Sequence, residues 1–229
     1  MKITLIILLT LLTALMAPPA FASNRVLSLD GDGDYVEIVP NENLNAINSQ
    51  ATIEAWIKAE ALLNGRMLII YKGDEEKPDF SNRSYDLALL PSGCILLASA
   101  PSGEKNVWIE SSSNLIKLNR WYHIAGVIDA KKNVIRMFIN GVEAASREFG
   151  DSIHVSALSL RIGWTYEDDS RYSSFAGQID EVRIWRIARS QEEIQATMHA
   201  TLSGKEPGLV GYWRFDDAGK IATDSSKNH

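Results

Sequence analysis

The chain of 229 residues has one cysteine, Cys94, and this scarcity excludes an internal disulfide. Cys94 begins an apolar run that continues to Leu97. The run indicates a small buried side chain, since no catalytic partner residues accompany it. The stability of the fold must therefore come from packing, with or without a metal ion.

Clusters of basic residues are also missing, because no run of five or more Lys or Arg occurs. The 29 acidic residues outnumber the 23 basic ones and give a formal net charge of -6. Nucleic acids and anionic lipid surfaces are bound by faces rich in Lys and Arg. The composition therefore excludes nucleic acid as a partner.

A strongly apolar run occurs at the N-terminus, over residues 3–16, and Pro18-Pro19 interrupt the chain after it. Lys2 precedes the run, and the small residues of Ala20-Phe21-Ala22 follow it. This arrangement predicts a secretory signal peptide over residues 1–22; an uncleaved N-terminal anchor is the less favoured alternative. We expect an exported protein, either secreted, periplasmic or on the cell surface, with no membrane insertion after cleavage.

The rest of the chain consists of short alternating apolar runs between clusters of Gly, Asn, Asp, Ser and Pro, a pattern typical of β-strands. The clearest strands are expected at residues 52–58, 85–89, 121–128, 134–139, 158–162, 179–185 and 209–215. Asn140-Gly141 favours a tight hairpin turn. One helix is expected from Ser190, where Ser190 and Glu193 form a capping box and Ile194, Met198 and Leu202 share one face.

Five segments, taken in order, resemble the laminin-G-like jelly rolls of the concanavalin A-like lectin/glucanase superfamily, in their bacterial exported form. The segments are residues 29–38 (LDGDGDYVEI), 52–58 (TIEAWIK), 119–127 (NRWYHIAGV), 138–141 (FING) and 175–185 (FAGQIDEVRIW). The resemblance implies an all-β, two-sheet antiparallel jelly-roll sandwich with one short C-terminal amphipathic helix.

The resemblance places the domain at residues 23–203 and leaves residues 204–229 as a terminal strand and tail. Residues 208–216 and 224–229 resemble the segments with which such a module begins. We expect the strand to complete the sandwich from the C-terminal side, and the tail to be the start of a second copy in a longer chain.

The acidic run Asp30-Gly31-Asp32-Gly33-Asp34 suggests calcium, because hard cations require several oxygen ligands. The resemblance implies a structural Ca²⁺ between the terminal strands, held by Asp32 or Asp34 with Asp180 and Glu181. This expectation requires residues 30–35 to lie near strand 179–185. The alternative is a turn whose aspartates cap their own backbone.

Four aromatic residues, Trp108, Trp164, Tyr166 and Tyr172, lie in or beside expected loops, where they can stack on sugars or anchor a protein. Burial beneath the loops is the alternative. Trp56, Trp121, Trp185 and Trp213 lie within strand runs, which predicts core positions.

The leading function is a non-catalytic recognition or adhesion module that binds a glycan or a cell-surface protein; a structural spacer in a tandem protein is the alternative. A diverged glycoside hydrolase is less favoured. Glucanases of the superfamily use an E-x-D-x-x-E motif, which this chain lacks. The four histidines form no metalloprotease or catalytic-triad motif. Adjacent Asp180 and Glu181 should point to opposite faces of a strand.

Overall fold

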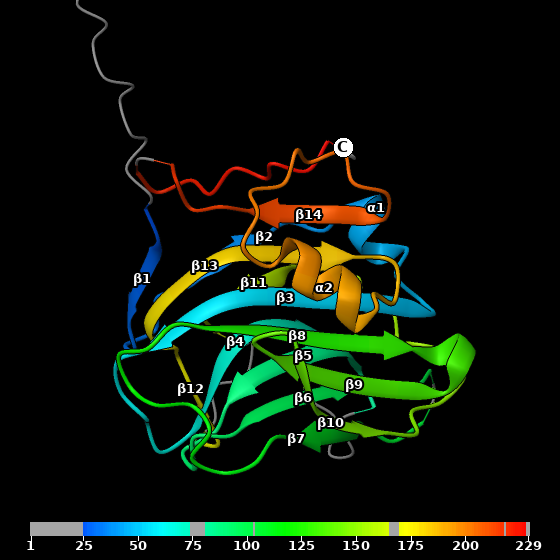
Figure 1. Cartoon of the computed structure of the whole chain (residues 1–229), viewed down its shortest axis with the longest axis horizontal. Coiled ribbons are helices and arrows are strands. Elements are labelled where there is room, and N and C mark those ends of the chain that lie inside the picture. Colours follow the sequence, from blue (N-terminus) through cyan, green and yellow to red (C-terminus); the bar gives the residue numbers. More distant parts are fainter. Residues whose placement is uncertain (1–24, 74–80, 103, 165–169, 218, 228–229) are drawn as a thin grey trace, which may run out of the picture.

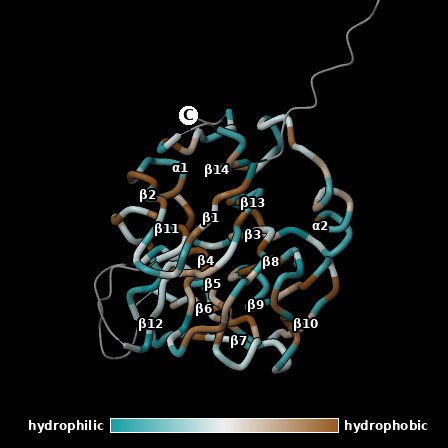
Figure 2. Tube along the Cα trace, turned by 90° about the vertical axis from the view of Figure 1, so that its left-hand side faces the viewer, coloured by the Kyte–Doolittle hydropathy of each residue, from teal (hydrophilic) through white to brown (hydrophobic). Residues whose placement is uncertain are grey.

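In the computed structural model, two seven-stranded sheets face each other, which confirms the predicted jelly-roll sandwich. The structure describes residues 25–73, 81–102, 104–164, 170–217 and 219–227. The expected signal peptide lies outside these residues. Figure 1 shows one sheet in front of the other, and Figure 2 shows the two layers from the side, with helix α2 outside the first sheet.

Sheet A has the strand order β1-β13-β3-β8-β9-β10, with β14 paired to β13. Its strands are β1 (Leu27–Asp30), β3 (Gln50–Ala59), β8 (Tyr122–Asp129), β9 (Val134–Ile139), β10 (Val142–Arg147), β13 (Ala176–Trp185) and β14 (Leu209–Trp213).

Sheet B has the order β2-β11-β4-β5-β6-β7, and the short β12 runs parallel to β4. Its strands are β2 (Val36–Ile38), β4 (Arg66–Gly73), β5 (Arg83–Leu89), β6 (Ile95–Ser99), β7 (Val107–Glu110), β11 (Leu160–Ile162) and β12 (Tyr172–Ser173).

Strand β3 shows how alternation divides the residues between the core and the outer face. Ile53, Ala55 and Ile57 are fully buried in the core between the sheets. The intervening Glu54 and Trp56 face outward, because successive side chains of a strand point to opposite sides. Strand β8 lies between β3 and β9, as the apolar character of both its faces predicted.

Three short helices complete the described part of the chain: α1 (Glu42–Asn45), the 3₁₀ turn η1 (Ala130–Lys132) and α2 (Gln191–Thr197). The predicted capping box at Ser190 and Glu193 is present. Helix α2 packs Ile194 on Ala125 and Val127 of β8, on the outer face of sheet A. It ends earlier than its apolar pattern suggested, so that Leu202 lies beyond the helix. None of the described helices is long and apolar enough to span a membrane.

The first and last strands of the sandwich share one neighbour, because β1 and β14 both pair with β13. Leu27 lies opposite Ile179, and Arg183 lies opposite Tyr212. Strand β14, from the segment after residue 203, thus belongs to sheet A, together with β1 and β13.

Gly177 of β13 provides a test of this packing, because it has a positive φ of 145° and lies tightly against β3. A Cβ at this position would lie 2.2 Å from the carbonyl oxygen of Lys58. We expect Gly177→Ala to lower the free energy of unfolding by about 2 to 4 kcal/mol, through backbone strain together with overpacking.

The matched control is Gly33→Ala. Gly33 also has a positive φ, 89°, but a Cβ there would meet nothing within 4 Å. Its expected loss is about 1 kcal/mol, from the backbone conformation alone. Urea denaturation followed by circular dichroism measures both losses, and equal values would show that the contact of Gly177 with β3 has no energetic weight.

Candidate functional site

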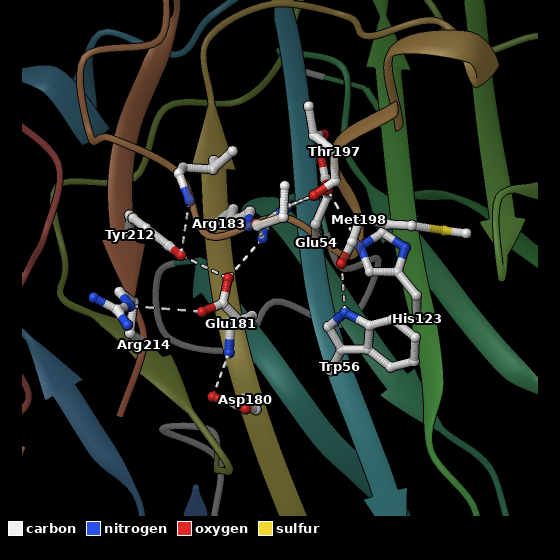
Figure 3. A network of polar contacts seen from close by, with 12 residues as sticks. Glu54, Trp56, His123, Asp180, Glu181, Arg183, Thr197, Met198, Tyr212 and Arg214 are labelled. Atoms are coloured by element: carbon white, nitrogen blue, oxygen red, sulfur yellow. Dashed lines mark hydrogen bonds and ion pairs between the residues drawn. The ribbon is translucent and has the colours of Figure 1, made fainter. Parts of the chain in front are cut away.

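A fully buried carboxylate, Glu54 of β3, lies on the outer face of sheet A beneath α2 (Figure 3). Nη1 of Arg189 donates to its Oε1 at 2.7 Å, and Nη1 of Arg183 lies 3.9 Å from its Oε2. The Nε2 atom of His123, on neighbouring β8, lies 3.3 Å from the same Oε2. The carboxylate is therefore surrounded by cationic or polar groups from three segments of the chain.

Burial by itself would raise the pKa of Glu54, because a low-dielectric interior disfavours the charged form. The nearby imidazole of His123 and the charges of Arg189 and Arg183 outweigh burial and lower this pKa below its ordinary value. Glu54 is thus a carboxylate held ionised by its neighbours, as is expected of a structural ion pair.

The two arginines and Trp56 hold the C-terminal end of α2 against the sheet. Nη2 of Arg189 donates to the hydroxyl of Thr197, the last residue of α2, at 2.9 Å, and to the carbonyl of Glu193 in the first turn at 2.6 Å. Arg183 donates to the carbonyls at Thr197 and Ala200, at 2.9 and 2.7 Å, and the indole Nε1 of Trp56 donates to that of Met198 at 2.8 Å. Arg183 and Trp56 thereby satisfy carbonyls that a helix end leaves without intrahelical partners. Residues 198–201 are consequently fixed above β3 and β13.

A β-bulge in β13 lies next to this helix end. The pairing with β3 shifts between Asp180, opposite Trp56, and Arg183, opposite Glu54. Glu181 within the bulge has a positive φ of 51°, which is uncommon for a residue other than glycine. The expectation that Asp180 and Glu181 point to opposite faces is wrong here, because the inserted residue breaks the alternation and both residues line one pocket.

The side chain of Glu181 accepts from Nη2 of Arg183 and from the hydroxyl of Tyr212, each at 2.6 Å. Nε of Arg214 lies 3.8 Å from its other oxygen (Figure 3). Burial, together with the hydrogen bond and charge of Glu181, raises the pKa of Tyr212 to about 12. These contacts stabilise the unusual backbone of the bulge.

The end of α2, the bulge of β13 and Trp121, which precedes β8, border an open pocket of about 620 Å³. We call it the helix-side pocket. Its lining combines aromatic rings, a carboxamide and carboxylates, namely Trp56, Trp121, His199, Gln178, Asp180 and Glu181, with Val26, Arg183, Met198, Ala200 and Thr201 completing it. Trp121 is 39% exposed, although its strand-like surroundings predicted a core position. Apolar rings with a few polar groups are typical of small-ligand sites.

The aromatic residues predicted to bind ligand lie elsewhere. Trp108 is 50% exposed on β7, at the edge of sheet B, and Trp164 is half-buried. Tyr172 is buried on β12, where it accepts a short hydrogen bond from Arg83, and Arg66 lies over its ring. Tyr166 lies outside the described residues. None of the three described residues lines the helix-side pocket. Trp185 and Trp213 are buried as predicted.

A family model described as the concanavalin A-like lectin/glucanases superfamily, of the laminin-G-like type, matches residues 30–195. The chain belongs to this superfamily. No match was found among curated proteins.

Several solved structures share this superfamily fold. One is a protein of Bacteroides ovatus ATCC 8483 that has been proposed to bind carbohydrate, with 22% identity over 86% of this chain and a TM-score of 0.66. This chain spans 54% of that protein's length. Another is domain 4 of an extracellular GH43 arabinanase from Geobacillus stearothermophilus, in complex with arabinotriose, with 20% identity over 75% of this chain and 80% of that one, and a TM-score of 0.52.

A third is the CBM40 of a Ruminococcus gnavus IT-sialidase bound to α2,3-sialyllactose. It shares 18% identity over 74% of this chain and 96% of its own, with a TM-score of 0.55. At identities this low, the three likenesses establish the fold alone. What this member of the superfamily binds must be argued from its own site.

The residues proposed for calcium lie at two ends of β1. Asp30 lies opposite Ala176, whereas Leu27 lies opposite Ile179, so the Asp30–Asp34 turn and Asp180 are about four residues apart along β13. The Asp30 carboxylate accepts from the backbone N–H of Asp32 at 2.8 Å, as the turn-cap alternative expected. Among the described residues, no group of three or more His, Cys, Asp or Glu side chains is placed to hold a metal ion.

Calcium binding by the acidic turn stays a prediction, and the register of β1 sharpens its test. Four strand residues span about 13 Å, beyond the reach of one ion with 2.3 to 2.6 Å ligand distances. Asp180→Ala should therefore leave the calcium response of the melting temperature as it is in the wild type. Melting curves with calcium and with chelator measure this response, and its loss in Asp180→Ala would restore the shared site that the resemblance implied.

The network around Glu54 makes a prediction about stability. Glu54→Gln leaves two buried guanidinium groups without their carboxylate, and we expect a loss of about 3 to 5 kcal/mol in the free energy of unfolding at pH 7. Because folding lowers the pKa of Glu54, its contribution is present in full above the unfolded pKa near 4.5 and is lost as the pH falls through the folded value. The variant should therefore lose less stability than the wild type between neutral and acid pH.

Glu37→Gln is the control, because Glu37 forms an ion pair with Arg161 at 3.0 Å while its side chain is 40% exposed. Exposed pairs of this kind contribute about 0 to 1 kcal/mol. Chemical denaturation of both variants at several pH values makes the comparison. Equal losses for the two variants would refute a dominant role for Glu54.

Proposed function

We propose that this chain is a non-catalytic carbohydrate-binding module of an exported protein, and that the helix-side pocket binds the glycan. The observation that carries this proposal is the meeting of Trp121 and Trp56 with Gln178, Asp180 and Glu181 in one open pocket. Aromatic rings cover the apolar faces of sugars, while amide and carboxylate groups bind their hydroxyls. The pocket offers both kinds of group side by side.

The exposed indole of Trp121 is the main apolar surface for a sugar ring. Trp56 adds a second ring from β3. Its Nε1 donates to the Met198 carbonyl, and its ring packs against His123 and His199 at centroid distances of 5.4 and 5.2 Å. A pre-positioned ring loses little conformational freedom when a ligand binds, which favours affinity.

The superfamily neighbours support the choice of ligand, since arabinotriose and sialyllactose occur in complexes of two of them. A cell-surface protein as partner receives no comparable support from them. Export rests on the N-terminal residues 1–22, whose composition is that of a signal peptide.

A binding role without catalysis is favoured by the state of the carboxylates. Glu54 is fully buried and paired with arginine, and Glu181 is engaged by Arg183 and Tyr212. Glycoside hydrolysis requires one carboxyl group that donates a proton and a second that acts as base or nucleophile. Two carboxylates held by cationic and hydroxyl donors suit the anchoring of a site better than proton transfer.

Trp121→Ala tests the assignment. We expect the affinity for a bound oligosaccharide to fall at least about tenfold, equivalent to about 1.4 kcal/mol, because the variant loses the exposed ring on which the sugar stacks. The melting temperature should change little, since the side chain is 39% exposed. A glycan array identifies the oligosaccharide, and isothermal titration calorimetry measures both affinities.

Trp108→Ala is the matched control, because Trp108 is a similarly exposed tryptophan on the other sheet. Its affinity should equal that of the wild type. Loss of binding in Trp108→Ala with retention in Trp121→Ala would move the glycan to sheet B. Release of reducing sugar from the bound oligosaccharide would contradict the non-catalytic assignment.

A further inference from the structure

The bulge in β13 gives the helix-side pocket a feature that bears on the class of ligand, namely two adjacent carboxylates on one side. In a regular strand, Asp180 and Glu181 would face opposite sides of the sheet. Here the register shift and the positive φ of Glu181 bring both into the lining of the pocket. The side of the pocket formed by β13 thus carries two carboxylates against one guanidinium, that of Arg183, which is paired with Glu181.

The cationic groups near these carboxylates are already engaged within the protein, Arg183 by Glu181 itself and Arg214 by Asp216. Arg183, which also lines the pocket, has a side chain that is 1% exposed, and it donates to Glu181, Thr197 and Ala200. Nη2 of Arg214 lies 2.5 Å from Asp216. A ligand anion would therefore meet the carboxylates without a guanidinium fork exposed to receive it.

Cations also occur near the described lining of the pocket without being part of it, among them Lys58, Arg25 and Arg120. Lys58, opposite Gln178 on β3, lies 3.7 Å from Glu60. Arg25 and Arg120 adjoin the lining residues Val26 and Trp121 along the chain. Salt screens such outlying charges more than it screens carboxylates within a pocket, so the carboxylates dominate the field that a bound sugar meets.

We propose, building on the proposed function, that the helix-side pocket selects neutral sugars and rejects sugars that carry a carboxylate or sulfate. Sugar hydroxyls are hydrogen-bond donors, so a neutral ring can pair with Asp180 while it stacks on Trp121. An acidic sugar places a like charge beside the carboxylates in a partly desolvated pocket, where such a juxtaposition is strongly unfavourable. The chain would then differ in ligand class from the sialyllactose-binding neighbour.

The test compares binding of neutral oligosaccharides with that of counterparts differing by one acidic sugar, for example arabinotriose and lactose against sialyllactose and oligosaccharides containing a uronic acid. We expect acidic counterparts to bind at least about tenfold more weakly than neutral ones. Affinity for the neutral ligand should stay constant as ionic strength rises, because no charge pair forms on binding.

Asp180→Asn should reduce the difference in affinity between neutral and acidic ligands, because it removes one of the two negative charges. Asp34→Asn, which alters an acidic turn outside this pocket, should leave the difference unchanged. If Asp180→Asn does not fold, the wild-type comparison and its salt series still decide the question.

Tighter binding of acidic ligands, weakened by salt and by Trp121→Ala, would overturn the neutral-sugar proposal and leave the glycan-binding function intact. Binding of neutral and acidic ligands with equal affinity would overturn it as well. Absence of binding to every oligosaccharide, or binding that Trp121→Ala does not change, would refute the proposed function itself and this inference with it.

Discussion

The outer face of sheet A is organised by the ion pair between the buried Glu54 and Arg189, with Arg183 close by. A charge with no exposed surface is stable in a protein only when it is paired and hydrogen-bonded. Each arginine meets this requirement twice, since it faces the carboxylate and also donates to α2. Arg183 donates to the carbonyls of Thr197 and Ala200 at the helix end, and Arg189 donates to the hydroxyl of Thr197. The helix is therefore attached to the sheet by polar contacts at the end where its backbone carbonyls would otherwise lack partners.

The helix-side pocket is a consequence of this attachment. Fixing α2 above β3 and β8 leaves an opening over β13, bordered by residues 198–201 on one side and Trp121 on the other. The bulge at Glu181 then turns two carboxylates into this opening. Apolar burial of Ile194 alone would hold the helix to the sheet without fixing the position of the chain that follows it.

The comparisons with solved structures fit a general property of jelly-roll sandwiches. Their core is filled by the inward faces of both sheets, so the outward faces and loops can change without altering the fold. This chain shares its fold, at identities of 18 to 22%, with one domain seen with arabinotriose and another seen with sialyllactose. The ligand class proposed for this chain therefore rests on its own outer face, at the helix-side pocket, and not on the shared fold.

The amino-acid sequence by itself determined the sandwich, the central position of β8 and the start of α2. Each depends on local signals, namely alternation, turn residues such as Asn140-Gly141, and the capping box at Ser190, which act between residues close in the chain. The hairpin shows this directly, since Asn140 and Gly141 both have the positive φ values that the turn requires.

Tertiary structure alone decided which outward residues meet. Trp121 has the alternation of a core residue but lies just before β8, where no second layer covers it. The positive φ in the bulge belongs to Glu181 and not to a glycine, so the sequence gives no local signal for the bulge. Contacts of Glu181 with Arg183 and with Tyr212 of β14 stabilise this backbone conformation. The register of β1 separates the acidic turn from Asp180. Register and bulges arise from pairing between segments distant in the chain, which no local pattern encodes.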